Sequence, residues 1–364
     1  MAEINFKKYI GEPDKERLIK AFKREEIDRV PNFEGLIEDK HVEKMLGRYA
    51  GNTFAFSGDP AKGKIDLNKT RPMFAKDYIE ICKIIGQDVI MLADNWTPFK
   101  KEDQKNSLVL AFDKSVKNLK DFRKLIKPDY KDIEKIINYI KEYKEAAVDT
   151  KIGIAVSFGS LFQTLYAFIV GFEDFMIACL EDRDFIEEML EISKDYWIEF
   201  SKAVVHEKVD IICIGDDVAF KSGLFIPLKL FSEIWIPRMT KIIEPAVKAN
   251  IPVQFHSDGK IDDIVEDLIE MGVDCLNPMD PYCIDYKEYK KKYNKNLTLS
   301  GNIDIGFPLV NGTPEDVEKD VKEHMKVLKP GYGYVACSSH SIVNYIPFEN
   351  FVTMINSIHK YGVY

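Results

Sequence analysis

Short apolar runs alternate with longer amphipathic segments along this chain. The short runs are rich in β-branched residues and end at glycine or at a polar residue, which is typical of buried strands. The longer segments repeat their apolar residues at helical spacing. This pattern predicts strands near 29–33, 88–94, 152–158, 209–215, 251–256, 273–277, 297–301 and 333–337. It predicts helices over 13–25, 75–86, 131–145, 163–202, 228–248, 260–271, 284–292, 314–328 and 347–360.

The number and order of these elements favour an α/β barrel. Strands separated by helices in this number match a closed (β/α)8 TIM barrel. An open doubly wound sheet is the alternative, but no G-x-G-x-x-G motif follows an early strand. Segment 36–75 is a long excursion after the first strand, and we expect it to cover a site or to make a subunit contact, such as a homodimer interface. Without a repeat or a linker rich in proline and serine, residues 1–364 are predicted to be a single domain.

Composition narrows the classes of partner. Hydrophobic residues make up 46% of the chain and charged residues 30%, the balance of a globular protein with a substantial core. The apolar stretches fall short of the ~20 residues that cross a bilayer, so no membrane partner is expected. The net charge is −9 and no basic stripe is present, which argues against nucleic acid. Six cysteines without a C-x-x-C pair indicate reduced thiols and a cytoplasmic location.

Side chains that can ligate a metal or transfer a proton stand at the ends of the predicted strands. In a (β/α)8 barrel the carboxyl ends of the strands meet at one rim, so these side chains should converge. His256 and Asp258 are two residues apart, which places them on one face if the strand continues. The full converging set is Glu34, Asp94, Asp216, Asp217, His256, Asp258, Asn277, Asn302, Asp304, Cys337 and His340.

This excess of carboxylates over arginines requires neutralisation by a divalent metal or a cationic substrate. His256 and Asp258 suit zinc, and His340 or Cys337 from the last strand could complete an open catalytic site. In the alternative interpretation, His256 is a hydrogen-bonded histidine at a strand end and Asp258 is a turn residue before glycine. Cys337 could equally be a small buried residue.

The remaining candidates have less specific surroundings. Asp216 and Asp217 could be an acid/base pair, two substrate contacts, or one site residue beside one helix cap. Asp94 precedes a turn with an aromatic wall and is a third catalytic candidate. Residues placed to contact a substrate are Glu34, Asn277, Asn302 and Asp304.

Six segments together carry a family resemblance. They are RLIKAFKREEIDRVP (17–31), GSLFQTLYAFIVGFEDF (159–175), FHSDGKIDDIVEDLIEMGVDCLNP (255–278), GNID (301–304), GTPEDV (312–317) and PGYGYVACSSHSIVNYIPFENF (330–351). In these segments the chain is similar to the uroporphyrinogen decarboxylase superfamily, which includes cobalamin-related methyltransferases. The resemblance spans essentially the whole chain.

The methyltransferase branch binds zinc through H-x-C-G and a late cysteine. His256 matches its first ligand, Asp258 replaces the first cysteine, and His340 falls where the second lies, with Cys337 three residues earlier. The resemblance implies a metal-dependent methyltransferase, with zinc as the expected metal. It would move a methyl group between the methylcobalamin of a corrinoid partner protein and a small acceptor, such as a thiol or a tetrahydropterin.

The decarboxylase branch is the alternative. Its members carry an arginine-rich segment after the first strand, whereas residues 32–39 here are acidic and would repel a polycarboxylate. Asp94 and His340 match residues of that branch, and Tyr166 stands beside Ala167, where a substrate-contacting tyrosine is usual. A lyase (decarboxylase) that acts on a smaller substrate therefore stays open as a second hypothesis. A non-catalytic barrel that binds a small ligand is the third.

Overall fold

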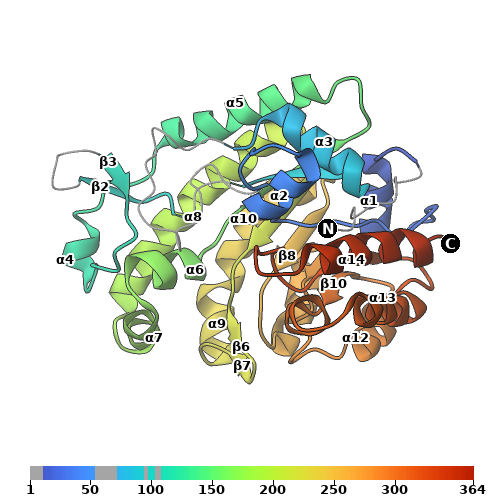
Figure 1. The fold of residues 1–364 in the computed structure, drawn as a ribbon. Coiled ribbons are helices and arrows are strands. Elements are labelled where there is room, and N and C mark those ends of the chain that lie inside the picture. Colours follow the sequence, from blue (N-terminus) through green and yellow to red (C-terminus); the bar gives the residue numbers. More distant parts are fainter. Residues whose placement is uncertain (1–10, 54–71, 94–96, 103–107) are drawn as a thin grey trace.

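The structure, a computed structural model, describes residues 11–53, 72–93, 97–102 and 108–364 (Figure 1). Its centre is one curled sheet of parallel strands in the order β1–β4–β5–β8–β9–β10–β11. These strands are β1 (Val89–Ala93), β4 (Gly153–Phe158), β5 (Ile211–Gly215), β8 (Val253–His256), β9 (Cys275–Asn277), β10 (Thr298–Ile303) and β11 (Tyr334–Ser338). Because neighbours in the sheet are also neighbours in sequence, the chain winds around the sheet in one direction, as in a TIM barrel.

Helices connect successive strands and cover the outside of the sheet (Figure 1). The main ones are α1 (Lys15–Phe22), α3 (Ala75–Ile85), α5 (Tyr130–Ala146), α8 (Arg183–His206), α10 (Ile236–Lys248), α11 (Val265–Met271), α12 (Tyr286–Tyr293), α13 (Pro314–Leu328) and α14 (Phe348–Tyr361). Shorter ones are α2 (Asp39–Leu46), α4 (Leu119–Phe122), α6 (Phe162–Thr164), α7 (Phe172–Glu181), α9 (Leu228–Ile234), η2 (Leu165–Ile169), η3 (Asp262–Ile264) and η4 (Ile305–Val310). No helix within the described ranges combines the length and the apolar character that crossing a membrane requires.

The first predicted strand, 29–33, is not a strand. It lies beside β11 through one parallel bridge between Asn32 and Ala336, and a second bridge joins Ile37 to Ile342. On its other side it meets the residues that lead into β1 through side chains only, since Asn32 Nδ2 donates to the carbonyl of Ile85. The TIM-barrel-like α/β class is confirmed, but the eighth strand of a closed barrel is absent from the described residues, and an irregular segment stands in its place.

Alternate residues of the strands pack on opposite sides of the sheet. One set, with Ile90, Val156 and Ile212 among its members, packs against the helices. The other set points into the barrel and includes Met91 and Cys213, together with residues of α1 that close the amino-terminal end. Since both faces are buried, the strands read as continuous apolar runs in the sequence. Polar side chains enter the interior near the carboxyl ends of the strands, and Thr298 does so at the amino end of β10, where its hydroxyl donates to the carbonyls of Ala21 and Phe22.

Two further segments differ from the sequence prediction. The predicted helix 163–202 is divided into α6, η2, α7 and α8, because Gly171 adopts a φ of 104° before α7 and Asp182 caps the start of α8. The excursion 36–75 contains α2, while residues 54–71 lie outside the described residues. Two small hairpins were not predicted; they are β2 (Lys100–Glu102) with β3 (Leu108–Leu110), and β6 (Ala219–Phe220) with β7 (Gly223–Leu224). The single domain over 1–364 stays a prediction.

Candidate functional site

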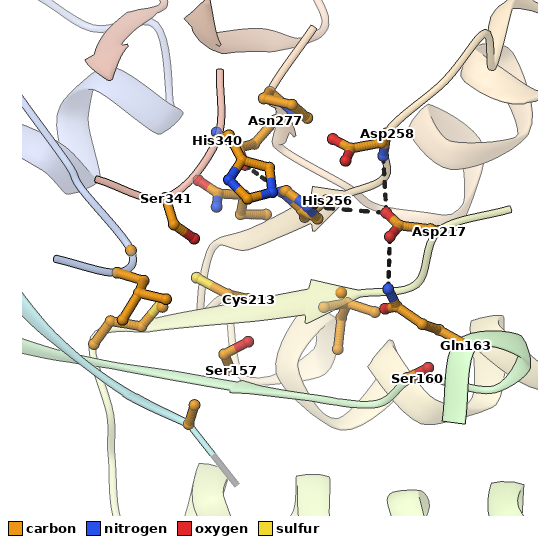
Figure 2. Close-up of a pocket in the computed structure, with 18 of the residues that line it drawn as sticks. Ser157, Ser160, Gln163, Cys213, Asp217, His256, Asp258, Asn277, His340 and Ser341 are labelled. Atoms are coloured by element: carbon orange, nitrogen blue, oxygen red, sulfur yellow. Dashed lines mark hydrogen bonds and ion pairs between the residues drawn. The ribbon is translucent and has the colours of Figure 1, made fainter. Parts of the chain in front are cut away.

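A pocket of about 490 Å³ opens at the carboxyl ends of the strands. Its polar part is built from residues at the ends of β5, β8, β9 and β11, and apolar residues, with Phe33, Met91 and Phe168 among them, line much of the rest. A pocket at this end of a barrel-like α/β fold is where such folds place their reacting groups. Figure 2 shows how the polar side chains point toward one another across the pocket.

Asp217, His256 and Asp258 form the densest group of possible ligands. One ligand atom from each can be chosen so that all three lie within 4.8 Å of one another. The sheet register explains the meeting, because Gly215 of β5 is paired with His256 of β8. Asp217 lies two residues after Gly215, and Asp258 lies two residues after His256, on the segments that follow these neighbouring strands. Their side chains therefore point to the same side of the sheet.

The imidazole of His256 is held by its neighbour in the sheet. Asn277 of β9 is paired with His256, and its Oδ1 lies 2.6 Å from Nδ1 of the ring. The same amide donates through Nδ2 to Ser300 Oγ at 3.1 Å and to Cys337 Sγ at 3.4 Å. With its nitrogen so engaged, the amide presents its oxygen to the ring, which assigns the proton of the neutral imidazole to Nδ1. Nε2 then points its lone pair toward Asp217, whose Oδ1 is 3.9 Å away.

Asp217 is oriented by three hydrogen bonds. Gln163 Nε2 donates to Oδ2 at 2.6 Å, and the backbone N–H of Asp258 donates to Oδ1 at 2.9 Å. The hydroxyl of Tyr166 donates to the Asp217 carbonyl at 3.1 Å. Tyr166 therefore positions the Asp217 backbone, and it is not among the residues that line the pocket.

The electrostatics of this group are those of a site that gains from a cation. Burial raises the pKa of Asp258 and the Asp217 carboxylate raises it further, although His256 and His340 oppose them. For His256, burial alone would lower the pKa, but the two carboxylates and the Asn277 hydrogen bond raise it above its ordinary value. Each shift shows that the two carboxylates repel one another and attract positive charge. One imidazole and two carboxylates are a donor set that fits a divalent metal such as zinc with open coordination positions.

Asp216 points away from the pocket, although it is adjacent to Asp217. Its buried carboxylate accepts hydrogen bonds from the backbone N–H groups of 161–163, from Ser160 Oγ at 3.0 Å and from Trp235 Nε1 at 2.7 Å. Burial nevertheless raises its pKa to about 6. Of the alternatives considered for this pair, the geometry matches the last one. Asp217 lines the pocket, and Asp216 caps the start of helix α6.

The carboxyl of Glu34 forms part of the pocket wall. It is 2% exposed and accepts hydrogen bonds from the backbone N–H of Ser338 at 2.9 Å and from its hydroxyl at 2.7 Å. Burial raises the pKa of Glu34 to about 7, against those two hydrogen bonds. A carboxyl with such a pKa can exchange a proton near neutral pH.

The expected third metal ligands lie apart from the cluster. His340 is exposed at the rim of the pocket, close enough to Asp258 to lower its pKa, but outside the group of three defined above. Cys337 is buried, and burial raises its pKa well above the ordinary value, so its sulfur stays a thiol. Among the described residues, Asp217 stands in the third position instead. The sequence analysis did not select Gln163. This residue lies in the short helix α6, which follows β4, and not directly at the end of a strand.

Three further candidates lie outside the pocket or outside the described residues. Asn302 donates to the Met279 carbonyl at 2.7 Å and accepts from His324 Nε2 at 2.8 Å, so its amide is engaged within the core. Asp304 accepts from the backbone N–H of residue 306 at 2.7 Å and caps the start of η4. Neither lines the pocket. Asp94 lies outside the described residues.

The family of the chain follows from its sequence match. Residues 105–361 match the family model described as Uroporphyrinogen decarboxylase (URO-D), and the chain belongs to this family. Within the family it resembles methylcobamide:CoM methyltransferases. MtaA of Methanosarcina barkeri is 26% identical over 202 residues, which are 54% of this chain and 56% of MtaA. MtbA of Methanosarcina mazei is 27% identical over 178 residues, 49% of this chain and 50% of MtbA.

The other branch of the family is also represented among its relatives. A uroporphyrinogen decarboxylase of Methylobacillus flagellatus is 24% identical over 260 residues, 68% of this chain and 70% of that protein. The solved structure of a methyltransferase from Methanosarcina mazei has the same fold, with a TM-score of 0.67 at 18% identity over 96% of this chain and 99% of that one. The chain spans about half the length of the curated methyltransferases that it matches.

Proposed function

We propose that the protein is a metal-dependent methyltransferase. It moves a methyl group between a methylcobalamin-bearing corrinoid protein and a small acceptor, such as a thiol or a tetrahydropterin. The observation that carries the proposal is the meeting of Asp217, His256 and Asp258 at one wall of the pocket. The resemblance to proteins named methylcobamide:CoM methyltransferases supports the reaction class.

The metal, most simply zinc, would be held by His256 Nε2 and by the carboxylates of Asp217 and Asp258. When bound, it would supply the positive charge that lowers the pKa of the acceptor. Asn277 keeps the ligand nitrogen of His256 directed at the pocket, and Gln163 fixes the carboxylate of Asp217. These partners hold the ligands ready, so little rearrangement is needed when the ion binds.

Two other parts of the pocket serve the transfer. The apolar residues Phe33, Met91 and Phe168 in the lining exclude water from the path of the methyl group. Glu34, whose pKa is about 7, takes up the proton that the acceptor loses, at its Oε2. The corrinoid protein docks at the mouth of the pocket, because its cofactor must reach the acceptor there.

A decarboxylase that acts on a smaller substrate is the second candidate. The match to the uroporphyrinogen decarboxylase model and the relative of that name favour it. His340 at the pocket rim and Glu34 in its wall would then handle protons, with no metal required. The two candidates therefore differ in whether activity depends on a metal.

Metal content and methyl transfer, measured on the same samples, test the proposal. Wild type, His256→Ala and the control His206→Ala are purified, analysed for metals, and assayed for demethylation of methylcobalamin with a panel of thiols and reduced pterins. His206 ends α8 with its side chain 88% exposed, so its replacement removes an imidazole far from the pocket. We expect one equivalent of metal and methyl transfer in wild type and control, and loss of both in His256→Ala. Metal-free wild type that turns over no acceptor would contradict the proposal.

A further inference from the structure

The amide of Asn277 lies between His256 and two polar side chains deeper in the barrel. We infer that Asn277 is a positioning residue that fixes which nitrogen of His256 faces the pocket, and thereby sets the affinity of the site for its metal. This inference rests on the proposed function, because it assigns a role within the same metal site. It replaces the substrate contact that the sequence suggests for Asn277.

The contacts of the amide occupy both of its ends. Its Oδ1 is 2.6 Å from His256 Nδ1, and its Nδ2 is 3.1 Å from Ser300 Oγ and 3.4 Å from Cys337 Sγ. Ser300 and Cys337 also contact each other at 3.4 Å, and both are buried. The hydroxyl and the thiol therefore hold the nitrogen end of the amide, while the oxygen end is left for the imidazole.

The opposite tautomer of His256 is less well satisfied. If the proton were on Nε2, it would point toward Asp217, whose Oδ1 is 3.9 Å away and beyond hydrogen-bonding distance. A proton on Nδ1 has the Asn277 oxygen as its acceptor at 2.6 Å. The tautomer with its proton on Nδ1 is therefore favoured. It leaves the Nε2 lone pair free for a metal, which binds only an unprotonated nitrogen.

Cys337 acquires a role in the same network. Its high pKa keeps the sulfur protonated, so it contacts the amide as a thiol and does not compete for the metal as a thiolate. The side chain that the sequence offers as a metal ligand instead supports the residue that orients a ligand. The chain of contacts runs from Cys337 and Ser300 through Asn277 to His256.

Zinc affinity of the full-length, metal-free protein tests the inference. The variants are Asn277→Leu, which removes both ends of the amide, and Asn277→Asp, which keeps the oxygen that faces His256. The matched control is Asn302→Asp, because Asn302 also accepts a hydrogen bond from a histidine, His324, but does not line the pocket. Competition with a chelating dye should show binding weakened about 10–100-fold in Asn277→Leu, and retained in Asn277→Asp and in the control. Unchanged zinc affinity in Asn277→Leu, with only KM for the acceptor raised, would overturn the inference in favour of a substrate contact.

A second measurement does not need the metal at all. The ¹⁵N spectrum of metal-free, histidine-labelled protein reports which ring nitrogen of His256 carries the proton, with the signal assigned from His256→Gln. We expect Nδ1–H in wild type and loss of that preference in Asn277→Leu. Nε2–H in wild type would refute the positioning role. If wild type binds no zinc but shows Nδ1–H, the proposed function fails at its metal while the Asn277–His256 pairing stands.

Discussion

In the folded protein Glu34 is predicted to exchange its proton near pH 7, so that its protonated and ionised forms are both present at neutral pH. The hydroxyl of Ser338 contacts two acceptors, Oε2 of Glu34 and the backbone carbonyl of His340, but has a single proton to donate. If Glu34 is ionised, one of these contacts lacks a proton. If Glu34 is protonated, it donates to Ser338 Oγ, which in turn donates to the His340 carbonyl, and every group is satisfied.

The size of the effect follows from the pKa. Burial raises the pKa of Glu34 from 4.5 to about 7, and each unit corresponds to about 1.4 kcal/mol. Because the pKa of this acid is higher in the folded than in the unfolded state, the folded protein binds the extra proton. Its stability therefore falls as pH rises from the unfolded value toward the folded one. Between pH 5 and pH 8 the ionisation of Glu34 should lower the free energy of unfolding by about 2.5 kcal/mol.

Glu34→Gln removes this dependence while it keeps the shape of the side chain. Urea unfolding of variant and wild type at pH 5, 6, 7 and 8 gives the difference in the free energy of unfolding at each pH. We expect the difference to move in favour of the variant by about 2.5 kcal/mol from pH 5 to pH 8. Glu134→Gln, an exposed glutamate of α5, is the control and should give a constant difference. Parallel pH profiles of wild type and Glu34→Gln would refute the reasoning.

Three further results are expected. Cys337→Ser should leave zinc content unchanged by elemental analysis, whereas loss of zinc would make Cys337 a ligand. Asp216→Ala should lower the free energy of unfolding by about 3–5 kcal/mol in urea, since the start of α6 and Trp235 Nε1 lose their buried acceptor; an unchanged midpoint would contradict the capping role. Zinc affinity, titrated by dye competition, should fall as pH is lowered, and sooner than for isolated side chains, because the pKa values of His256 and Asp258 are both raised; affinity constant with pH would exclude these ligands.

The buried strands were predictable because both of their faces are apolar. Each predicted run from 88–94 onward overlaps a strand of the sheet. The first, 29–33, failed because Pro31 has no N–H to donate and because its partners are mostly side chains, which leave no periodic pattern. The long helix 163–202 failed at Gly171 and Asp182, where local backbone geometry overrides a continuous apolar periodicity.

Selecting polar residues at the ends of the predicted strands identified several residues that line the pocket, but it did not show which way each side chain points. Glu34, Asp217, His256 and Asn277, which this selection includes, line one pocket, and their roles stay predictions. The selection also included Asn302, which follows Gly301, where φ is 126° and the backbone of Pro278 approaches so closely that an added Cβ would lie 2.0 Å from its carbonyl oxygen. This close approach of two backbone segments depends on tertiary contacts. The sequence alone therefore does not show that the in–out alternation of side chains along β10 breaks at Gly301.

The register between β5 and β8 explains why the side chain of Asp217, and not that of Asp216, enters the pocket. Cys213 points into the barrel, so residues 215 and 217 follow on the same side, while Asp216 faces the helices. The pairing of Gly215 with His256 then brings Asp217 level with Asp258. A shift by one residue would exchange the two aspartates.

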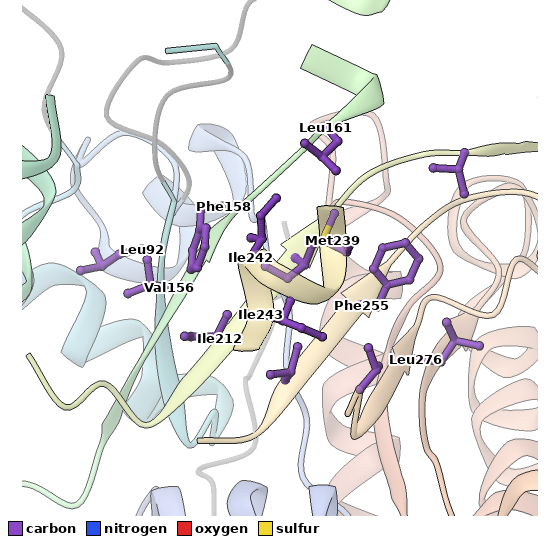
Figure 3. Packing of buried hydrophobic residues seen from close by; sticks show 14 of the residues in the cluster. Leu92, Val156, Phe158, Leu161, Ile212, Met239, Ile242, Ile243, Phe255 and Leu276 are labelled. Carbon is purple, nitrogen blue, oxygen red and sulfur yellow. The ribbon is translucent and has the colours of Figure 1, made fainter. Parts of the chain in front are cut away.

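The register itself is fixed on the other face of the sheet. Ile212 pairs with Val253 and Ile214 with Phe255, and these side chains pack with Met239, Ile242 and Ile243 of α10 (Figure 3). A slip of β8 by one residue would turn Val253 and Phe255 inward and bring Gln254 and His256 against α10. The apolar contacts of β8 outside the barrel therefore help to determine which carboxylates meet inside it.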